Sequence, residues 1–188
     1  MTNDNTSVAR PTESQKQAFG SLVPVRLGLA QDVRHKSVMS LNRLLAHTMA
    51  LRDLYKKFHW QASGATFFEL HQLFDKHYGE QEAIMDEIGE RIQTLGGVAR
   101  ATARDIVEET RLARPPGGIE GSHDQLLRLL GAHELVLGEA RPLATSAADT
   151  GDVGTNDLIV RLVRVNEVQS WYVWRQSSEA VSIPPIES

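Results

Sequence analysis

A single stretch of the chain, Phe67 to Leu95, places apolar residues at the three- and four-residue spacing of a helix. It follows the turn residues SGAT, in which Thr66 is a suitable N-cap, and it stops at the pair Gly96 and Gly97. A helix of this length has about seven turns. No segment of the chain alternates as a half-buried strand does, so we predict an all-α protein.

Three further segments show helical spacing. They predict a first helix from about residue 38 to His59, a third from Leu126 to a bend or end near Pro142, and a fourth from Leu158 to about Arg175. Residues 102–112 indicate a short helix before the breaker RPPGG, and DTGDVGTND (149–157) indicates a loop. The predicted fold is a four-helix bundle with a short extra helix in the middle connection.

The composition suits one domain with a core, because 41% of the 188 residues are hydrophobic. We expect a flexible N-terminal arm over 1–30, the bundle over 31–176 and a C-terminal tail over 177–188. No apolar run is long enough for a membrane span and the N-terminus lacks a secretory pattern, which favours a cytoplasmic protein. The net charge of -4 argues against a wholly basic nucleic-acid surface.

Metal-ligand residue types recur along the second helix and just before it. Since the chain has no cysteine, any metal must bind to His and carboxylate groups. The candidates are His59, His71, Asp75, Asp86 and Glu90. On a helical wheel the last four share a face that points away from the apolar stripe of their own helix. Asp75 and Asp86 are separated by about 16 Å of helix, so one helix cannot close a site around one metal.

The order of these residues suggests how a site could close. From His71 to Glu90 the intervals are 4, 11 and 4 residues, which read the same from either end. An identical helix laid antiparallel across a two-fold axis would bring His71 beside the partner's Glu90 and Asp75 beside the partner's Asp86. The alternative is that each is an ordinary solvent-facing residue. His77 and His133, which lie on or near apolar stripes, are expected to be packing residues.

The run HWQASGATFFELHQLFDKH, with MDEIGERIQTLGGVARAT after it, resembles the signature of the Dps family of miniferritins over roughly residues 35–175. The resemblance implies a ferritin-like bundle, with twelve copies assembled into a hollow shell. It also implies that His59, His71 and Asp75 of one subunit meet Asp86 and Glu90 of its two-fold mate in a di-iron ferroxidase centre. Lys56 and Trp60 match common family positions too; the alternatives are a solvated lysine and an interface aromatic.

The implied activity is oxidation of iron(II), preferably by hydrogen peroxide, with storage of the ferric product and protection of DNA. Mixed imidazole and carboxylate ligands suit iron(II) on chemical grounds. A structural zinc site is a third hypothesis, and zinc could substitute for iron. Single-chain di-iron bundles instead use two Glu-x-x-His motifs, whereas the single match here, Glu120 to His123, is expected in a loop.

Two further expectations concern charge. The alternative function is a nucleoid-binding shell that compacts DNA, with iron oxidation secondary; its weak basic arm would use Arg10, Lys16 and Arg26. The loop 149–157 resembles the family's acidic iron pore, with Asp152 and Asp157 at the matching separation. An N-cap role for Asp157 or Thr155 is the alternative there.

Overall fold

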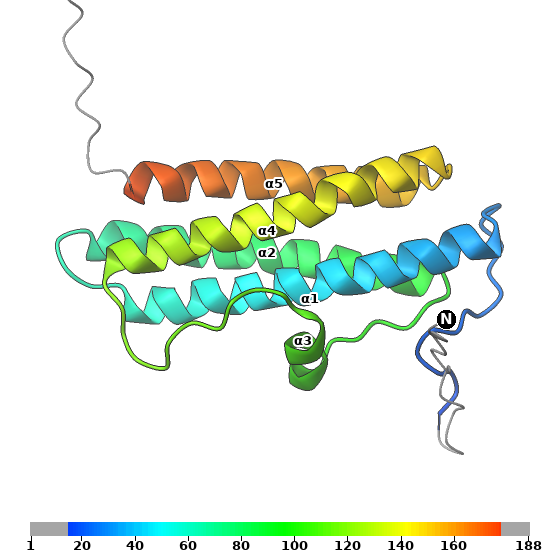
Figure 1. Cartoon of the computed structure of the whole chain (residues 1–188), viewed down its shortest axis with the longest axis horizontal. Coiled ribbons are helices and arrows are strands. Elements are labelled where there is room, and N and C mark those ends of the chain that lie inside the picture. Colours follow the sequence, from blue (N-terminus) through cyan, green and yellow to red (C-terminus); the bar gives the residue numbers. More distant parts are fainter. Residues whose placement is uncertain (1–14, 178–188) are drawn as a thin grey trace, which may run out of the picture.

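The computed structural model describes residues 15–177, and within that range it contains five helices and no strand. They are α1 (Gln31–Gln61), α2 (Phe67–Thr94), α3 (Ala103–Glu109), α4 (Ser122–Asp149) and α5 (Val153–Ser177). Figure 1 shows the four long helices side by side, with α3 outside them next to α1. The prediction of an all-α four-helix bundle with a short helix in the middle connection is confirmed.

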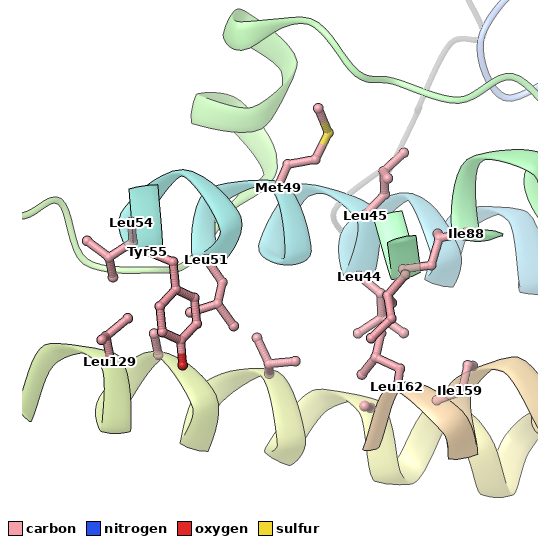
Figure 2. Packing of buried hydrophobic residues seen from close by; sticks show 14 of the residues in the cluster. Leu44, Leu45, Met49, Leu51, Leu54, Tyr55, Ile88, Leu129, Ile159 and Leu162 are labelled. Atoms are coloured by element: carbon pink, nitrogen blue, oxygen red, sulfur yellow. The ribbon is translucent and has the colours of Figure 1, made fainter. Parts of the chain in front are cut away.

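The core lies between two helical hairpins, α1 with α2 and α4 with α5. Figure 2 shows Leu51 and Tyr55 pointing from α1 toward α4, where Leu129 lies, and Leu44 meeting Leu162 of α5. These side chains are fully buried. Each fully buried leucine contributes roughly 1.5–3 kcal/mol relative to exposure, so the apolar stripes seen in the sequence hold the bundle together.

Several helix boundaries differ from the predicted ones: α1 begins at Gln31 rather than near residue 38, and α4 begins at Ser122 rather than at Leu126. Helix α4 continues for seven residues beyond Pro142, so of the two predicted alternatives an end there is wrong and a bend stays a prediction. Pro142 is exposed. Helix α5 starts at Val153, inside the predicted loop 149–157. The early start has a local cause, because the Asp152 carboxylate accepts a hydrogen bond from the Thr155 N–H and caps the helix.

The N-terminal segment packs on the bundle earlier than expected. Gln17 donates a side-chain hydrogen bond to the Gly96 carbonyl at 2.9 Å, and the Val23 N–H donates to the same oxygen at 2.9 Å. Gly96 has φ +84°, and a Cβ there would approach the Val23 carbonyl to 2.6 Å, so this contact requires glycine. The predicted arm boundary at residue 30 is therefore wrong for residues 17–23. Arg10 and the tail from 178 onward lie outside the described residues.

Among the described residues, no helix combines the length and the apolar character needed to cross a membrane.

Candidate metal centre

His59, near the end of α1, and His71, near the start of α2, face each other beside the turn that joins the two helices. The turn 62–66 reverses the chain, so the last turn of α1 lies against the second turn of α2. Their imidazole rings stack at 3.7 Å between centroids with an interplanar angle of 23°. His59 Nδ1 lies 2.9 Å from the His71 carbonyl oxygen, and His71 Nδ1 lies 3.0 Å from the His59 carbonyl oxygen.

This reciprocal arrangement determines the tautomer of both rings. A carbonyl oxygen only accepts hydrogen bonds, so each Nδ1 must carry the proton and donate it. Each Nε2 is then left with a lone pair, which is the form in which imidazole binds a metal. A hydrogen bond from the non-ligating nitrogen to a carbonyl is also the usual way in which proteins orient a ligand histidine. Two backbone carbonyls thus hold both half-buried rings in the tautomer that a metal-binding imidazole has.

Asp75 lies one turn further along α2 and is held by Lys56. The Lys56 Nζ is 2.6 Å from Asp75 Oδ1, and His59 Nδ1 is 3.9 Å from the same oxygen. The hydrogen bond from Lys56 holds the pKa of the Asp75 carboxyl below its usual value. Three of the predicted site residues and the accessory Lys56 therefore meet in one place, with the Asp75 carboxylate ionised and exposed to solvent.

Asp86 and Glu90 lie elsewhere on the subunit surface. They line a groove of about 600 Å³ formed by α1, α2 and the segment after α2, together with apolar residues that include Leu45, Met49 and Met85. Both carboxylates are exposed. Within residues 15–177, no group of three or more His, Asp or Glu side chains is arranged to hold a metal inside one subunit. The subunit thus carries two partial ligand sets: His59 of α1 with His71 and Asp75 of α2, and Asp86 with Glu90 of α2.

Trp60 follows His59 at the end of α1 and is 72% exposed, so its indole does not pack inside the subunit. Instead the ring of Phe67 packs near His71, with 5.2 Å between the two centroids.

The two predicted pore residues have different surroundings. Asp152 is fully buried: it accepts hydrogen bonds from Ser37 at 2.6 Å and from Arg91 at 2.6 Å, as well as from the Thr155 N–H. Burial alone would raise the pKa of Asp152, but these hydrogen bonds and the charge of Arg91 outweigh it and lower the pKa. The prediction that Asp152 lines an aqueous pore is therefore wrong for this subunit, since its carboxylate joins α1, α2 and α5. Asp157 is exposed on α5.

Near Asp157, the Arg161 side chain forms an ion pair with Glu87 of α2. The candidate DNA residues Lys16 and Arg26 are exposed on the packed N-terminal segment.

The sequence reasoning missed a polar cluster in the middle of the bundle. His77 and His133 are buried, as expected of packing residues, but they are hydrogen bonded to Tyr55 rather than surrounded only by apolar groups. Fully buried polar residues of α2 and α5 complete the cluster: Gln81, Asn166 and Gln169. The available signal was the presence of polar side chains on the apolar stripes of all four long helices.

Comparison with known proteins gives one consistent result. The family model for the ferritin-like domain matches residues 39–177. The solved structure of DpsC from Streptomyces coelicolor is 46% identical and superposes with a TM-score of 0.87 over 88% of this chain and 96% of that one. A nutrient stress-induced DNA-binding protein of Nostoc is 30% identical over 162 residues, which are 86% of this chain and 88% of the relative.

The Dps protein of Vibrio cholerae, described as a member of a broad superfamily of ferritin-like diiron-carboxylate proteins, is 25% identical with a TM-score of 0.78 over 84% of this chain and 99% of that one. The sequence signature, the five-helix architecture and these matches agree, and the chain belongs to the Dps family of ferritin-like proteins.

Proposed function

We propose that this protein is a miniferritin that oxidises iron(II) with hydrogen peroxide, or with oxygen, stores the ferric product and so protects DNA from oxidative damage. Iron is its substrate and its cargo. Each oxidation centre would combine His59, His71 and Asp75 of one subunit with Asp86 and Glu90 of the partner subunit. Membership of a ferritin-like family supports this reading.

The observation that carries the proposal is the reciprocal hydrogen bonding of His59 and His71. A pair of ordinary surface histidines would be free to rotate and to exchange tautomers. Here both rings are held in one orientation with their Nε2 lone pairs available, beside an ionised carboxylate. Two imidazoles and a carboxylate are a suitable partial ligand set for iron(II), and they leave coordination positions open for a partner's carboxylates and an oxidant.

The missing ligands are supplied by symmetry in this proposal. Since the intervals between His71, Asp75, Asp86 and Glu90 read the same in both directions, an antiparallel pair of α2 helices makes two equivalent centres. The groove that carries Asp86 and Glu90 is open on the side that a second subunit would cover. Six such pairs would make the dodecameric shell expected of the family.

The chemistry balances with peroxide as a two-electron acceptor: two iron(II) ions lose one electron each, and hydrogen peroxide takes up both electrons and two protons to give two waters. Where the two electrons arrive as a pair, peroxide is reduced to water without forming a hydroxyl radical. Glu90 is the strongest candidate to bridge or hold the tighter-bound iron, with Asp75 beside it. A structural zinc site, the remaining alternative, would bind metal without any oxidation.

The decisive test is absorbance-monitored oxidation of iron(II) by peroxide and by oxygen, on full-length protein whose mass is measured by light scattering. We expect rapid oxidation by wild type and loss of the rapid phase in His59→Ala and His71→Ala. His123→Ala, at the exposed start of α4, is the matched control and should oxidise iron as wild type does. Metal binding without oxidation would instead support a structural zinc site.

The path of iron into the shell involves Asp157 in this proposal, since the other pore candidate is buried. An exposed carboxylate repeated around a pore raises the local cation concentration, an effect that salt weakens. Iron uptake by Asp157→Asn should be slower than wild type at low ionic strength and should match it at high salt. If Asp157→Asn and wild type take up iron at the same rate at low ionic strength as well as at high salt, Asp157 does not line the iron pore.

DNA binding is a second candidate function, which the 30% identical DNA-binding relative favours. Lys16 and Arg26 are exposed, and a shell would repeat them with multivalent effect. We expect full-length protein with Arg10, Lys16 and Arg26 all changed to Ser to bind DNA more weakly and with a smaller salt dependence. Arg104→Ser on α3, at a site with 88% side-chain exposure, is the control. If the triple variant and the Arg104→Ser control bind DNA equally well, the DNA contact lies elsewhere on the protein.

A further inference from the structure

The centre of the bundle holds a tyrosine between two histidines. The Tyr55 hydroxyl lies 2.6 Å from His133 Nε2 and 3.1 Å from His77 Nδ1, and all three side chains are fully buried. They come from three different helices, α1, α4 and α2. A buried hydrogen-bonded cluster adds little more to the free energy of unfolding than apolar side chains of the same shape would. Stability alone therefore does not explain why these polar groups are in the core.

The direction of each hydrogen bond in this cluster follows from its neighbours. Asn166 Nδ2 donates to the Leu162 carbonyl at 2.9 Å, which turns Asn166 Oδ1 toward His133 Nδ1 at 3.0 Å. Since an amide oxygen only accepts, His133 Nδ1 carries the proton and His133 Nε2 has the lone pair. The Tyr55 hydroxyl must therefore donate to His133, and the short distance indicates a strong hydrogen bond.

The second histidine completes the arrangement. With its proton directed to His133, the Tyr55 oxygen can only accept from His77 Nδ1, so His77 Nδ1 is protonated. His77 Nε2 is then an acceptor, and it is buried without a partner. If the Tyr55 proton moved to His133, the phenolic oxygen would keep two hydrogen-bond donors, His77 Nδ1–H and His133 Nε2–H. The Tyr55 oxygen would thus keep both of its hydrogen bonds after that transfer.

His133 is able to receive that proton. Burial lowers the pKa of His133 to about 4, so the ring is neutral in neutral solution. Burial, with the charge of Glu80, raises the pKa of Tyr55 well above its usual value, so the phenol does not ionise on its own. Loss of an electron changes this balance, because an oxidised phenol is a very strong acid and passes its proton to any base within hydrogen-bonding reach.

The position of Tyr55 points to the source of the oxidant. Tyr55 and His59 are four residues apart on α1, so their Cβ atoms are separated by roughly 6 Å, one helical turn. A stray one-electron oxidant formed from peroxide at the candidate metal centre would therefore arise close to the buried phenol.

We propose that Tyr55 and His133 form a buried redox pair that quenches one-electron oxidants formed at the iron centre, with the phenol proton passing to His133 Nε2. This part of the inference rests on the proposed iron oxidation. The step is balanced as follows: Tyr55 loses one electron and one proton and becomes a neutral phenoxyl radical. A hydroxyl radical gains that electron and a proton from solvent and becomes water, while His133 holds the phenol proton.

The chain contains three tyrosines, which makes the test direct. Tyr78 bonds to Glu82 near the surface, and the Tyr172 ring lies 6.0 Å from the His77 ring. A full-length variant with Tyr78→Phe and Tyr172→Phe keeps Tyr55 as its sole tyrosine. After reaction with iron(II) and peroxide, freeze-quench electron paramagnetic resonance should detect a tyrosyl radical in this variant. The signal should be lost when Tyr55→Phe is added and should fall severalfold with His133→Gln, since an amide is not a base.

A second arm separates this inference from iron chemistry. In this arm, flash-generated ruthenium(III) tris-bipyridine serves as the oxidant, without iron. It is applied to the variant that keeps Tyr55 as its sole tyrosine and to the variant in which Tyr55→Phe is added. Transient absorbance should detect the tyrosyl radical only where Tyr55 is present. If iron is oxidised at the wild-type rate but Tyr55 gives no radical in either arm, the redox pair is excluded and the proposed function stands. If the photochemical radical forms at Tyr55 but no iron is oxidised, the pair stands and the proposed iron function fails.

Discussion

The carboxylate of Asp75, a proposed iron ligand, forms an ion pair with the ammonium group of Lys56. Lys56 Nζ lies 2.6 Å from Asp75 Oδ1, and the pair is at the surface, with the Asp75 side chain 51% exposed. A bound metal ion must compete with this ammonium group for the carboxylate. In the proposed centre Lys56 would therefore be a weak internal competitor of the metal, and its hydrogen bond lowers the pKa of Asp75.

Replacing Lys56 with Met should remove this competition. An exposed ion pair is worth roughly 0.2–1 kcal/mol, so we expect iron(II) to bind up to about fivefold more tightly in Lys56→Met. Anaerobic titration calorimetry measures the difference. Lys57→Met is the control, because Lys57 bonds to Gln61 and the Gly118 carbonyl instead of Asp75. Weaker binding by Lys56→Met alone would mean that Lys56 orients Asp75 rather than competing for it.

The buried His133 should make the bundle sensitive to acid. Its pKa is lowered to about 4 in the folded subunit, against about 6.5 in an unfolded chain, so the unfolded state takes up the proton first as the pH falls. The stability from this group is complete above pH 6.5 and is lost between about pH 6.5 and 4. The loss amounts to about 3 kcal/mol.

Chemical unfolding at a fixed protein concentration, repeated across this pH range, measures that loss. In His133→Gln the unfolding free energy should change less steeply with pH, by up to about 1.4 kcal/mol per unit, because one titrating group is gone. An unchanged slope would show that His133 is not the group responsible.

At the scale of helices, α4 contains a proline that its packing tolerates. Pro142 has no N–H to donate to the Gly138 carbonyl one turn earlier, and a proline inside a helix costs about 3 kcal/mol relative to alanine. Its side chain is exposed. The helix still continues to Asp149, since Ala144 and Ala147 beyond the proline are buried and fix this last part of α4 against the bundle.

Pro142→Ala should therefore stabilise the subunit by about 1 to 3 kcal/mol, measured by chemical or thermal unfolding. Thr145→Ala, an exposed change one turn further along α4, should alter stability by less than about 1 kcal/mol. A lower stability of Pro142→Ala would indicate that the packing of α4 depends on the proline.

On the scale of the whole molecule, the proposed centre belongs to a pair of subunits. One variant with His71→Ala and Asp75→Ala and another with Asp86→Ala and Glu90→Ala should each lack rapid oxidation when assembled alone. After the two are unfolded, mixed equally and reassembled, half of the two-fold interfaces are mixed. Each mixed interface has one complete centre and one that keeps only His59, so about a quarter of all centres should recover.

Stopped-flow oxidation measures the recovery, and mass spectrometry confirms that the shells contain both variants. If all the ligands of a centre came from one chain, every centre would still lack a pair and mixing would restore nothing. Absence of recovery in confirmed mixed shells would therefore exclude the intersubunit centre while leaving the fold and family membership intact.

Much of the architecture follows from the sequence alone, because it depends on local periodicity. The spacing of apolar residues predicted the long helices, the pair Gly96 and Gly97 marked the end of α2, and the position of the short helix α3 was expected between them and RPPGG. The likeness to Dps proteins, and with it the candidate ligands, could also be recognised from residue types and intervals. The helices depend on neighbours within a turn or two, and the candidate ligands are recognised from residue types and their intervals along the chain.

The tertiary structure decided which partner each polar side chain has. Asp152 meets Ser37 across 115 residues of chain, and Tyr55 meets His133 across 78. Because such contacts depend on how helices are placed in space, no local spacing distinguishes a pore carboxylate from a buried helix cap. The same holds for the tautomers of His59 and His71, which depend on two backbone carbonyls brought together by the hairpin. Sequence determined the helices and the candidate ligands; packing determined which groups are buried, charged and free to react.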